Sequence, residues 1–256
     1  MSAPWIVAFC VALFAGLHLA LGLPPLRPRL IARLGEPRFV ALFSGLAGLS
    51  LLLLAAAVYR AGALGPPMPA LAAELRAVLG ALALLGWLCA MASFDGYTRS
   101  PMAVLRTRYG PPAGFQVITR HGFFVGFAIY AGAHALLVPT IAQAIYFGGF
   151  ALLSLIGVVW QDRKLLHRHG PAYAEYMAST SILPFAAVLR GRQRLSTPSW
   201  VQCARPMALT LLPVVLHPWL SMANGAWLAG LLGVGGIALA ARRWRGVPSG
   251  EVAARR

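Results

Sequence analysis

The chain has 256 residues, of which 59% are hydrophobic and only 11% are charged, and its formal net charge is +16. This excess of apolar residues excludes an ordinary water-soluble domain, in which roughly half of the residues are apolar and roughly a quarter are charged. The sequence also lacks zinc-finger, RNP and helix-turn-helix patterns, so nucleic acid is not an expected partner despite the positive charge.

Seven stretches of the sequence carry no Asp, Glu, Lys or Arg. In chain order they cover residues 5–23, 39–59, 77–94, 123–138, 141–160, 206–220 and 226–241. A helix needs about 20 mainly apolar residues to cross a bilayer, and several of these stretches reach that length. We therefore predict an all-α fold: a polytopic bundle of six or seven transmembrane helices.

Basic residues are concentrated in every other gap between these stretches. The basic segments are 24–38, 95–120, 162–205 and 242–256. Because arginines and lysines accumulate on the cytoplasmic side, this alternation predicts an outside amino terminus and a cytoplasmic carboxyl terminus. The expected location is the bacterial cytoplasmic (inner) membrane. The expected partners are the lipid bilayer and its anionic headgroups, together with a hydrophobic or small-molecule substrate that the sequence does not identify.

The order of these segments predicts three regions. A main transmembrane domain covers 1–222, an additional transmembrane helix covers 223–241, and a basic disordered tail covers 242–256. The polar stretch 161–205 contains a short apolar piece, 182–189, which is too short to span and is expected at the membrane surface.

Four histidines lie in or at the ends of the apolar stretches: His18, His121, His134 and His217. Ionisable residues inside a membrane are costly and are often functional. The predicted topology places His18 and His121 near the inner face, while His134 lies about 20 Å further out, at a depth similar to that of His217. Membrane haem is commonly held between two imidazoles from different helices, so these histidines are candidate metal ligands.

Arg120 and His121 stand where the fourth apolar helix is expected to begin. Unpaired backbone N–H groups and the positive end of the helix dipole point at this spot, and Arg120 adds a planar donor fork. We therefore expect Arg120 and His121 to bind an anionic group of a cofactor, either a haem propionate or the carboxylate of S-adenosylmethionine.

Several short segments, found in a fixed order, form the most specific signal in the chain. They are Gly16-Leu17-His18, Leu26-Arg27-Pro28-Arg29-Leu30, Ile118-Thr119-Arg120-His121, Ala133-His134 and His217-Pro218-Trp219-Leu220. Together they resemble the NnrU family of integral membrane proteins, which would identify 1–222 as an NnrU-like domain. The resemblance implies a role in the nitrite and nitric oxide metabolism of denitrifying bacteria. The same domain is similar to zeta-carotene isomerase, a haem b membrane enzyme whose two histidine ligands correspond by motif to His18 and His134.

A second, more distant resemblance rests on Arg120-His121, on Asp162 and on the segment from His169 to Tyr176. These residues look like those with which isoprenylcysteine methyltransferases hold S-adenosylmethionine. Three alternatives to an NnrU-type haem protein of nitrogen-oxide metabolism therefore stay open. They are a carotenoid cis-trans isomerase, an S-adenosylmethionine-dependent membrane methyltransferase and a non-catalytic assembly protein. If the chain is an enzyme, the haem hypothesis predicts an isomerase or redox activity.

Overall fold

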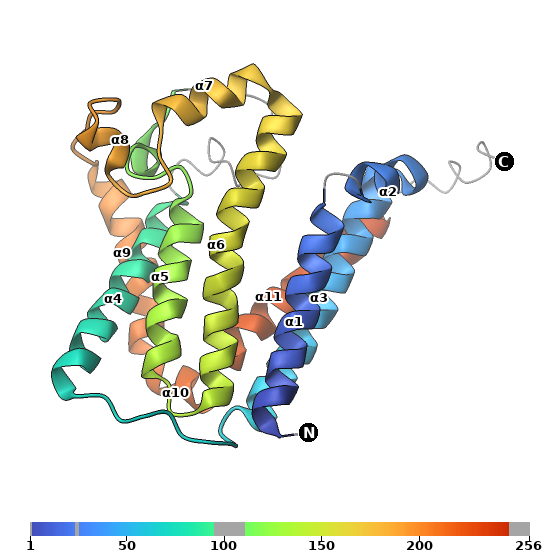
Figure 1. Ribbon diagram of the computed structural model, residues 1–256, viewed down its shortest axis with the longest axis vertical. Helices are drawn as coiled ribbons and strands as arrows, with labels where there is room; N and C mark the ends of the chain where they lie inside the picture. The colour runs from blue at the N-terminus through green and yellow to red at the C-terminus, as the bar shows by residue number, and fades with distance from the viewer. Residues whose placement is uncertain (1, 24–25, 95–110, 246–256) are drawn as a thin grey trace. The chain divides into compact units, whose positions relative to one another are not determined.

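The structure is a computed structural model that describes residues 2–23, 26–94 and 111–245, and it is all-α over these ranges (Figure 1). Among the described residues the only extended pairing is an isolated bridge between Pro67 and Thr140. The helices are α1 Ala3–Gly22, α2 Leu26–Leu34, α3 Glu36–Ala61, α4 Ala73–Ala92, η2 Gly114–Val117, α5 Gly122–Leu137, α6 Ile141–His169, α7 Pro171–Ser179, α8 Ala186–Leu189, α9 Trp200–Val215, α10 His217–Met222 and α11 Ala226–Arg245. Most of the predicted basic loop 95–120 and most of the predicted tail lie outside the described residues.

The helical bundle that the sequence predicts is confirmed, since each of the seven apolar stretches is helical. Within the described part of the chain, four helices are long and apolar enough to cross a membrane: α1, α3, α4 and α6. Two more apolar helices, α5 and α9, are shorter. The protein is therefore a multi-pass membrane protein, while the total of six or seven spans and the orientation of the termini stay predictions.

The observed helices extend beyond the apolar stretches in two places. The fifth stretch was expected to end near 160, but α6 continues to His169. Residues 161–169 contain no proline or glycine, and the helix ends at Gly170, whose φ is +51°. Likewise α11 continues to Arg245, past the expected tail boundary at 242. Three arginines in its last turn interact favourably with the helix dipole there.

Two of the apolar segments are not continuous helices. The sixth stretch is divided between α9 and α10, because Pro218 has no N–H and restricts the residue before it. The short apolar piece 182–189 is a loop followed by the single turn α8, and Phe185 at its start has a positive φ of 63°. A turn at Asn224-Gly225, with positive φ at both residues, separates α10 from α11.

The chain forms two compact units whose segments alternate along the sequence. Unit 1 comprises Met1–Met68, Pro139–Tyr146 and Pro218–Arg256, and unit 2 comprises Pro69–Val138 and Phe147–His217. Helix α6 therefore begins in unit 1 and continues in unit 2. The last helix, α11, was predicted as a separate addition, and it packs in unit 1. The domain boundary at residue 222 stays a prediction.

In unit 1, α3 packs against α1 on one side and α11 on another. A Cβ atom added to Gly48 would lie 2.7 Å from the carbonyl oxygen of Gly233 and 2.8 Å from the amide nitrogen of Ile237. The two backbones therefore touch, as small residues at membrane helix interfaces allow. The glycine-bearing face of α3 therefore makes a close contact with α11.

A polar cluster joins the start of α6 to the turn before α11 in unit 1. The amide of Gln143 donates to Asn224 Oδ1 at 3.4 Å, Asn224 Nδ2 donates to the carbonyl of Tyr59 at 3.1 Å, and the hydroxyl of Tyr146 donates to the carbonyl of Gly225 at 2.9 Å. The Thr140 hydroxyl donates to the carbonyl of Gly62. Side chains thus satisfy backbone carbonyls where the helices end, as an apolar surrounding requires.

In unit 2, α5 packs tightly between α4 and α6. A Cβ atom on Gly86 would lie 2.5 Å from the amide nitrogen of Tyr130 and 2.7 Å from the carbonyl oxygen of Gly126. On the other side of α5, the ring of Phe127 meets that of Phe150 edge-on at 6.0 Å. These contacts fix the position of α5. The residues just before its first turn belong to the candidate site.

Helix α9 of unit 2 contains Pro213, which cannot donate the usual bond to the carbonyl of Leu209. The indole N–H of Trp87 on α4 donates to this carbonyl at 3.2 Å. A neighbouring helix therefore satisfies the backbone group that the proline leaves open, which is how membrane helices tolerate proline.

We predict a coupling between these two residues. Trp87→Phe removes the donor and should destabilise the protein by about 1 kcal/mol, because the Leu209 carbonyl loses its partner. In a Pro213→Ala background the helix supplies its own N–H, so the same Trp87→Phe change should cost clearly less. A double-mutant cycle on thermal unfolding in detergent measures the difference, and equal costs in both backgrounds would contradict the explanation.

Candidate functional site

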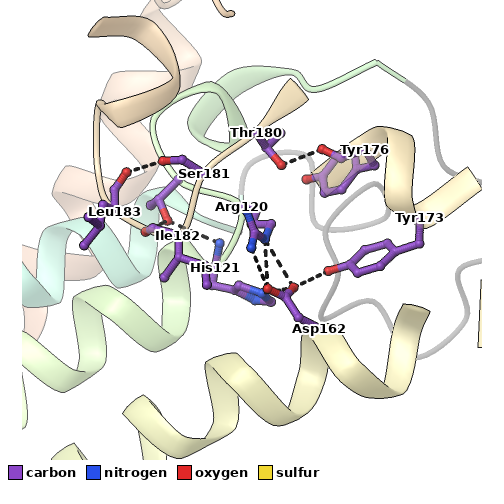
Figure 2. Close-up of polar contacts among 10 residues, drawn as sticks. Arg120, His121, Asp162, Tyr173, Tyr176, Thr180, Ser181, Ile182 and Leu183 are labelled. Carbon is purple, nitrogen blue, oxygen red and sulfur yellow. Dashed lines mark hydrogen bonds and ion pairs between the residues drawn. The ribbon is translucent and has the colours of Figure 1, made fainter. Parts of the chain in front are cut away.

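A buried carboxylate forms the centre of a polar network at one end of unit 2 (Figure 2). Asp162 on α6 accepts from Arg120 Nη2 at 2.6 Å and from Arg120 Nε at 3.1 Å. Its Oδ1 accepts from His121 Nε2 at 2.7 Å and from the Tyr173 hydroxyl at 2.6 Å. His121 is 0% exposed, Asp162 6% and Arg120 7%, so the ion pair is largely shielded from solvent. Removing a partner from such a buried pair is costly.

The backbone before α5 is held by the loop that precedes α8. The amide of Arg120 donates to the carbonyl of Ser181 at 3.0 Å, and the amide of Phe185 donates to the carbonyl of Ile118 at 2.9 Å. The hydroxyl of Thr119 donates to the carbonyl of Ile182 at 2.7 Å. Two segments about 60 residues apart in the chain are thereby tied together. This fixes Arg120 and His121, the residues that directly precede α5.

Helix α7 contributes two stacked tyrosines, Tyr173 and Tyr176, beside the network. The Tyr173 ring is fully buried and lies 5.8 Å from the Tyr176 ring. Burial raises the pKa of the Tyr173 hydroxyl above its usual range, and donation to the Asp162 carboxylate raises it further. Tyr173 is therefore a permanent hydrogen-bond donor, and it helps to keep Asp162 ionised.

The network leaves one buried ring atom without a protein partner. His121 Nε2 faces Asp162, whereas Nδ1 is buried and makes no hydrogen bond to the described part of the chain. With Nε2–H donating to the carboxylate, Nδ1 of a neutral imidazole carries a lone pair. A histidine oriented in this way by a carboxylate can accept a hydrogen bond, take up a proton or ligate a metal.

The structure brings together Arg120 and His121, the residues expected to bind an anionic cofactor group. Within the protein, however, Asp162 already offers a carboxylate to both of them. The bond from Arg120 uses Nε and Nη2. Their binding of a cofactor stays a prediction.

His134 lies in the last turn of α5, between two aromatic rings. Its Nδ1 lies 3.0 Å from the carbonyl oxygen of Tyr130, one helical turn back. The ring centroids of Tyr130 and Phe147 are 4.3 and 5.1 Å away. If Nδ1–H donates to the carbonyl, Nε2 carries the lone pair, which is the arrangement commonly found in metal-ligating histidines.

His18 lies on α1 in unit 1, whereas His134 belongs to unit 2. Its ring contacts Phe14 and Phe43 at centroid distances of 5.5 and 5.1 Å. His217 begins α10 and is exposed. Over the described ranges no group of three or more His, Cys, Asp or Glu side chains forms a metal site. The iron ligands therefore stay predictions.

The sequence singled out Asp162 and Tyr173 only through resemblances to known families, and it did not indicate that Asp162 joins the side chains of Arg120, His121 and Tyr173. A signal was present. The chain has only six acidic residues, and Asp162 lies two residues after the end of the apolar stretch 141–160. A carboxylate in that position is costly unless cations or donors face it.

Comparison with known proteins agrees with this description. The family described as "NnrU protein" matches residues 6–224. The chain is 38% identical over 82 residues to the 15-cis-zeta-carotene isomerase of Zea mays, and the match covers 32% of this chain and 22% of that protein. It is 32% identical over 116 residues to the Arabidopsis thaliana isomerase, covering 43% and 32% respectively.

The chain thus matches no more than a third of the length of these curated relatives, both of which are described as chloroplastic. No solved structure matches it. The family match covers most of the 256 residues and includes every element of the candidate site. The chain belongs to the NnrU family.

Proposed function

We propose that this chain is a haem b-binding protein of the bacterial cytoplasmic membrane, in which His134 and, by the resemblance, His18 would hold the iron. Family membership supports a role in nitrite and nitric oxide metabolism. The two relatives, both named 15-cis-zeta-carotene isomerases, support cis-trans isomerisation of a conjugated hydrocarbon as the alternative reaction. Both functions depend on the same iron site.

The observation that carries this proposal is the hydrogen bond from His134 to the carbonyl of Tyr130. It fixes the tautomer and leaves Nε2 as a ligand atom, and the rings of Tyr130 and Phe147 restrict the rotation of the imidazole. A bound haem would supply one redox-active iron at this nitrogen. The chain itself would supply the orientation of the imidazole and an apolar surrounding that excludes water.

The test is the absorption spectrum of detergent-purified protein expressed with added haem, recorded reduced minus oxidised. We expect a Soret band with sharp reduced α and β bands, and we expect His134→Ala and His18→Ala each to change or abolish them because one axial ligand is lost. His167→Ala, which removes an exposed histidine of α6, is the matched control and should leave the spectrum unchanged.

Two outcomes would change the proposal. A protein without haem, or an unchanged spectrum in His134→Ala, would overturn it and favour a non-catalytic assembly role. A spectrum that depends on His134 and His217 but not on His18 would keep the haem and replace the second ligand, as the similar predicted depth of His134 and His217 allows.

A second candidate, methyl transfer from S-adenosylmethionine, is favoured by one observation. Residues that carry the methyltransferase resemblance come from three separate elements, and Arg120, His121, Asp162 and Tyr173 meet in one buried network. In this proposal the network would hold the cofactor at the amino-terminal end of α5.

Arg120→Lys separates a binding site from a membrane anchor. Lysine preserves length and charge but loses the planar fork, so anchoring would tolerate the change and a bidentate site would not. We expect normal membrane insertion with weakened haem retention. Loss of S-adenosylmethionine binding instead, measured by isothermal titration, would support methyl transfer, and an unchanged haem content would reduce Arg120 to a structural residue.

A further inference from the structure

Helix α2, Leu26–Leu34, is a short amphipathic helix that the proposed function does not use. It lies between α1 and α3 and contacts both. Its apolar residues Leu26, Leu30, Ile31 and Leu34 are half-buried. Because α1 and α3 are both long and apolar enough to cross a membrane, the helix that joins them lies at the level of the lipid headgroups.

The opposite face of α2 carries two exposed arginines, Arg29 and Arg33. They are four residues apart, so their side chains leave neighbouring positions about 5–6 Å apart on one helix face. The helix sequence, LRPRLIARL, contains no acidic residue that could compensate them. Two like charges at this spacing destabilise a helix unless an anion lies between them.

A third arginine fixes the helix to its neighbour. The guanidinium of Arg27 lies 4.9 Å from the centre of the Phe39 ring, at the start of α3. A cation over an aromatic face is attracted to it. This contact and the half-buried apolar face set the rotation of α2, and Arg29 and Arg33 are consequently held on its exposed side.

We propose that Arg29 and Arg33 form a binding site for the phosphate of an anionic phospholipid in the leaflet that contains α2. Two guanidinium forks can share the oxygens of one phosphate, which an exposed lysine pair does less well. The depth of α2 selects a lipid phosphate over a free one, because the acyl chains extend along the same apolar helices that α2 joins. The site is independent of the haem proposal.

The test is lipid retention by the full chain. Wild-type protein is purified from equimolar phosphatidylglycerol and phosphatidylcholine, and the retained lipids are counted by native mass spectrometry. The double variant Arg29→Gln/Arg33→Gln should lose the preference for phosphatidylglycerol by roughly tenfold or more, since each basic residue near the surface contributes about a factor of five to ten. Arg60→Gln/Arg76→Gln, which removes the same charge from two exposed arginines elsewhere, should keep the preference.

An unchanged preference in Arg29→Gln/Arg33→Gln would overturn the proposal, as would an equal loss in the control pair, which would indicate a general effect of net charge. Displacement of the lipid by millimolar inorganic phosphate would also overturn it, by showing that the arginines take a free anion. Haem content measured in the same samples should not change, so a failed haem proposal does not affect this result.

Discussion

Replacing Asp162 with alanine should destabilise the folded protein more than almost any other single change, by about 3–5 kcal/mol. Arg120 and His121 would stay buried, but the carboxylate that faces both of them would be gone. Tyr173 would also lose the acceptor of its hydroxyl. The measurement is thermal unfolding in detergent, followed by fluorescence-detected size exclusion.

The control for this change is Glu175→Gln, in which an exposed carboxylate of α7 is neutralised. Its effect should stay within about 0.5 kcal/mol, because surface substitutions away from special features have small effects. Asp162→Asn keeps the shape and removes only the charge, and it should still cost well over half of the alanine effect. If Asp162→Ala and Glu175→Gln prove equally mild, the network does not support the fold.

The second large effect is expected at the crossing of α4 and α5. The added methyl of Gly86→Ala would lie 2.5 Å from one backbone nitrogen and 2.7 Å from one backbone oxygen of α5, so the helices have to separate. Overpacking of this kind costs about 1–3 kcal/mol, and more where only backbone can move. Because Arg120 and His121 of the candidate site directly precede α5, we also expect Gly86→Ala to disturb haem or cofactor retention.

Gly80→Ala is the matched control, since it lies on the same helix and nothing is within 4 Å of the position of its Cβ. Alanine is the better helix former, so this change should be neutral or stabilise the protein by up to about 1 kcal/mol. Equal destabilisation by both changes would contradict the explanation, because the added methyl of Gly80→Ala meets no atom of a neighbouring helix.

The sequence predicted the helices well because their signal is local. Absence of charge over about 20 residues is enough to place α1, α3 and α4. The extension of α6 to His169 was not predictable from hydropathy, because the added residues are polar and basic. Helices α2 and α7 are similarly short and polar, and their helical state depends on packing against longer neighbours.

The site was predictable only in part. The position of Arg120 and His121 at the start of a helix followed from the end of a charged segment. That Asp162 lies between them and Tyr173 could not follow, because these residues are about 40 and 11 positions away and meet only through the packing of α5, α6 and α7. The His18 and His134 pair stays a prediction, since it rests on a resemblance alone.

The alternation of the two units along the chain has a consequence for biosynthesis. All segments of unit 2 have been made once residue 217 has been synthesised, whereas unit 1 lacks α11 until almost the whole chain has emerged. Until then the glycine face of α3, which meets α11 at Gly48, has no partner from that helix and is exposed to lipid or to a membrane insertase. A nascent chain that is arrested once residue 217 has emerged from the ribosome should therefore have a candidate site that is already assembled and protected from proteases, while α3 still lacks its contact with α11.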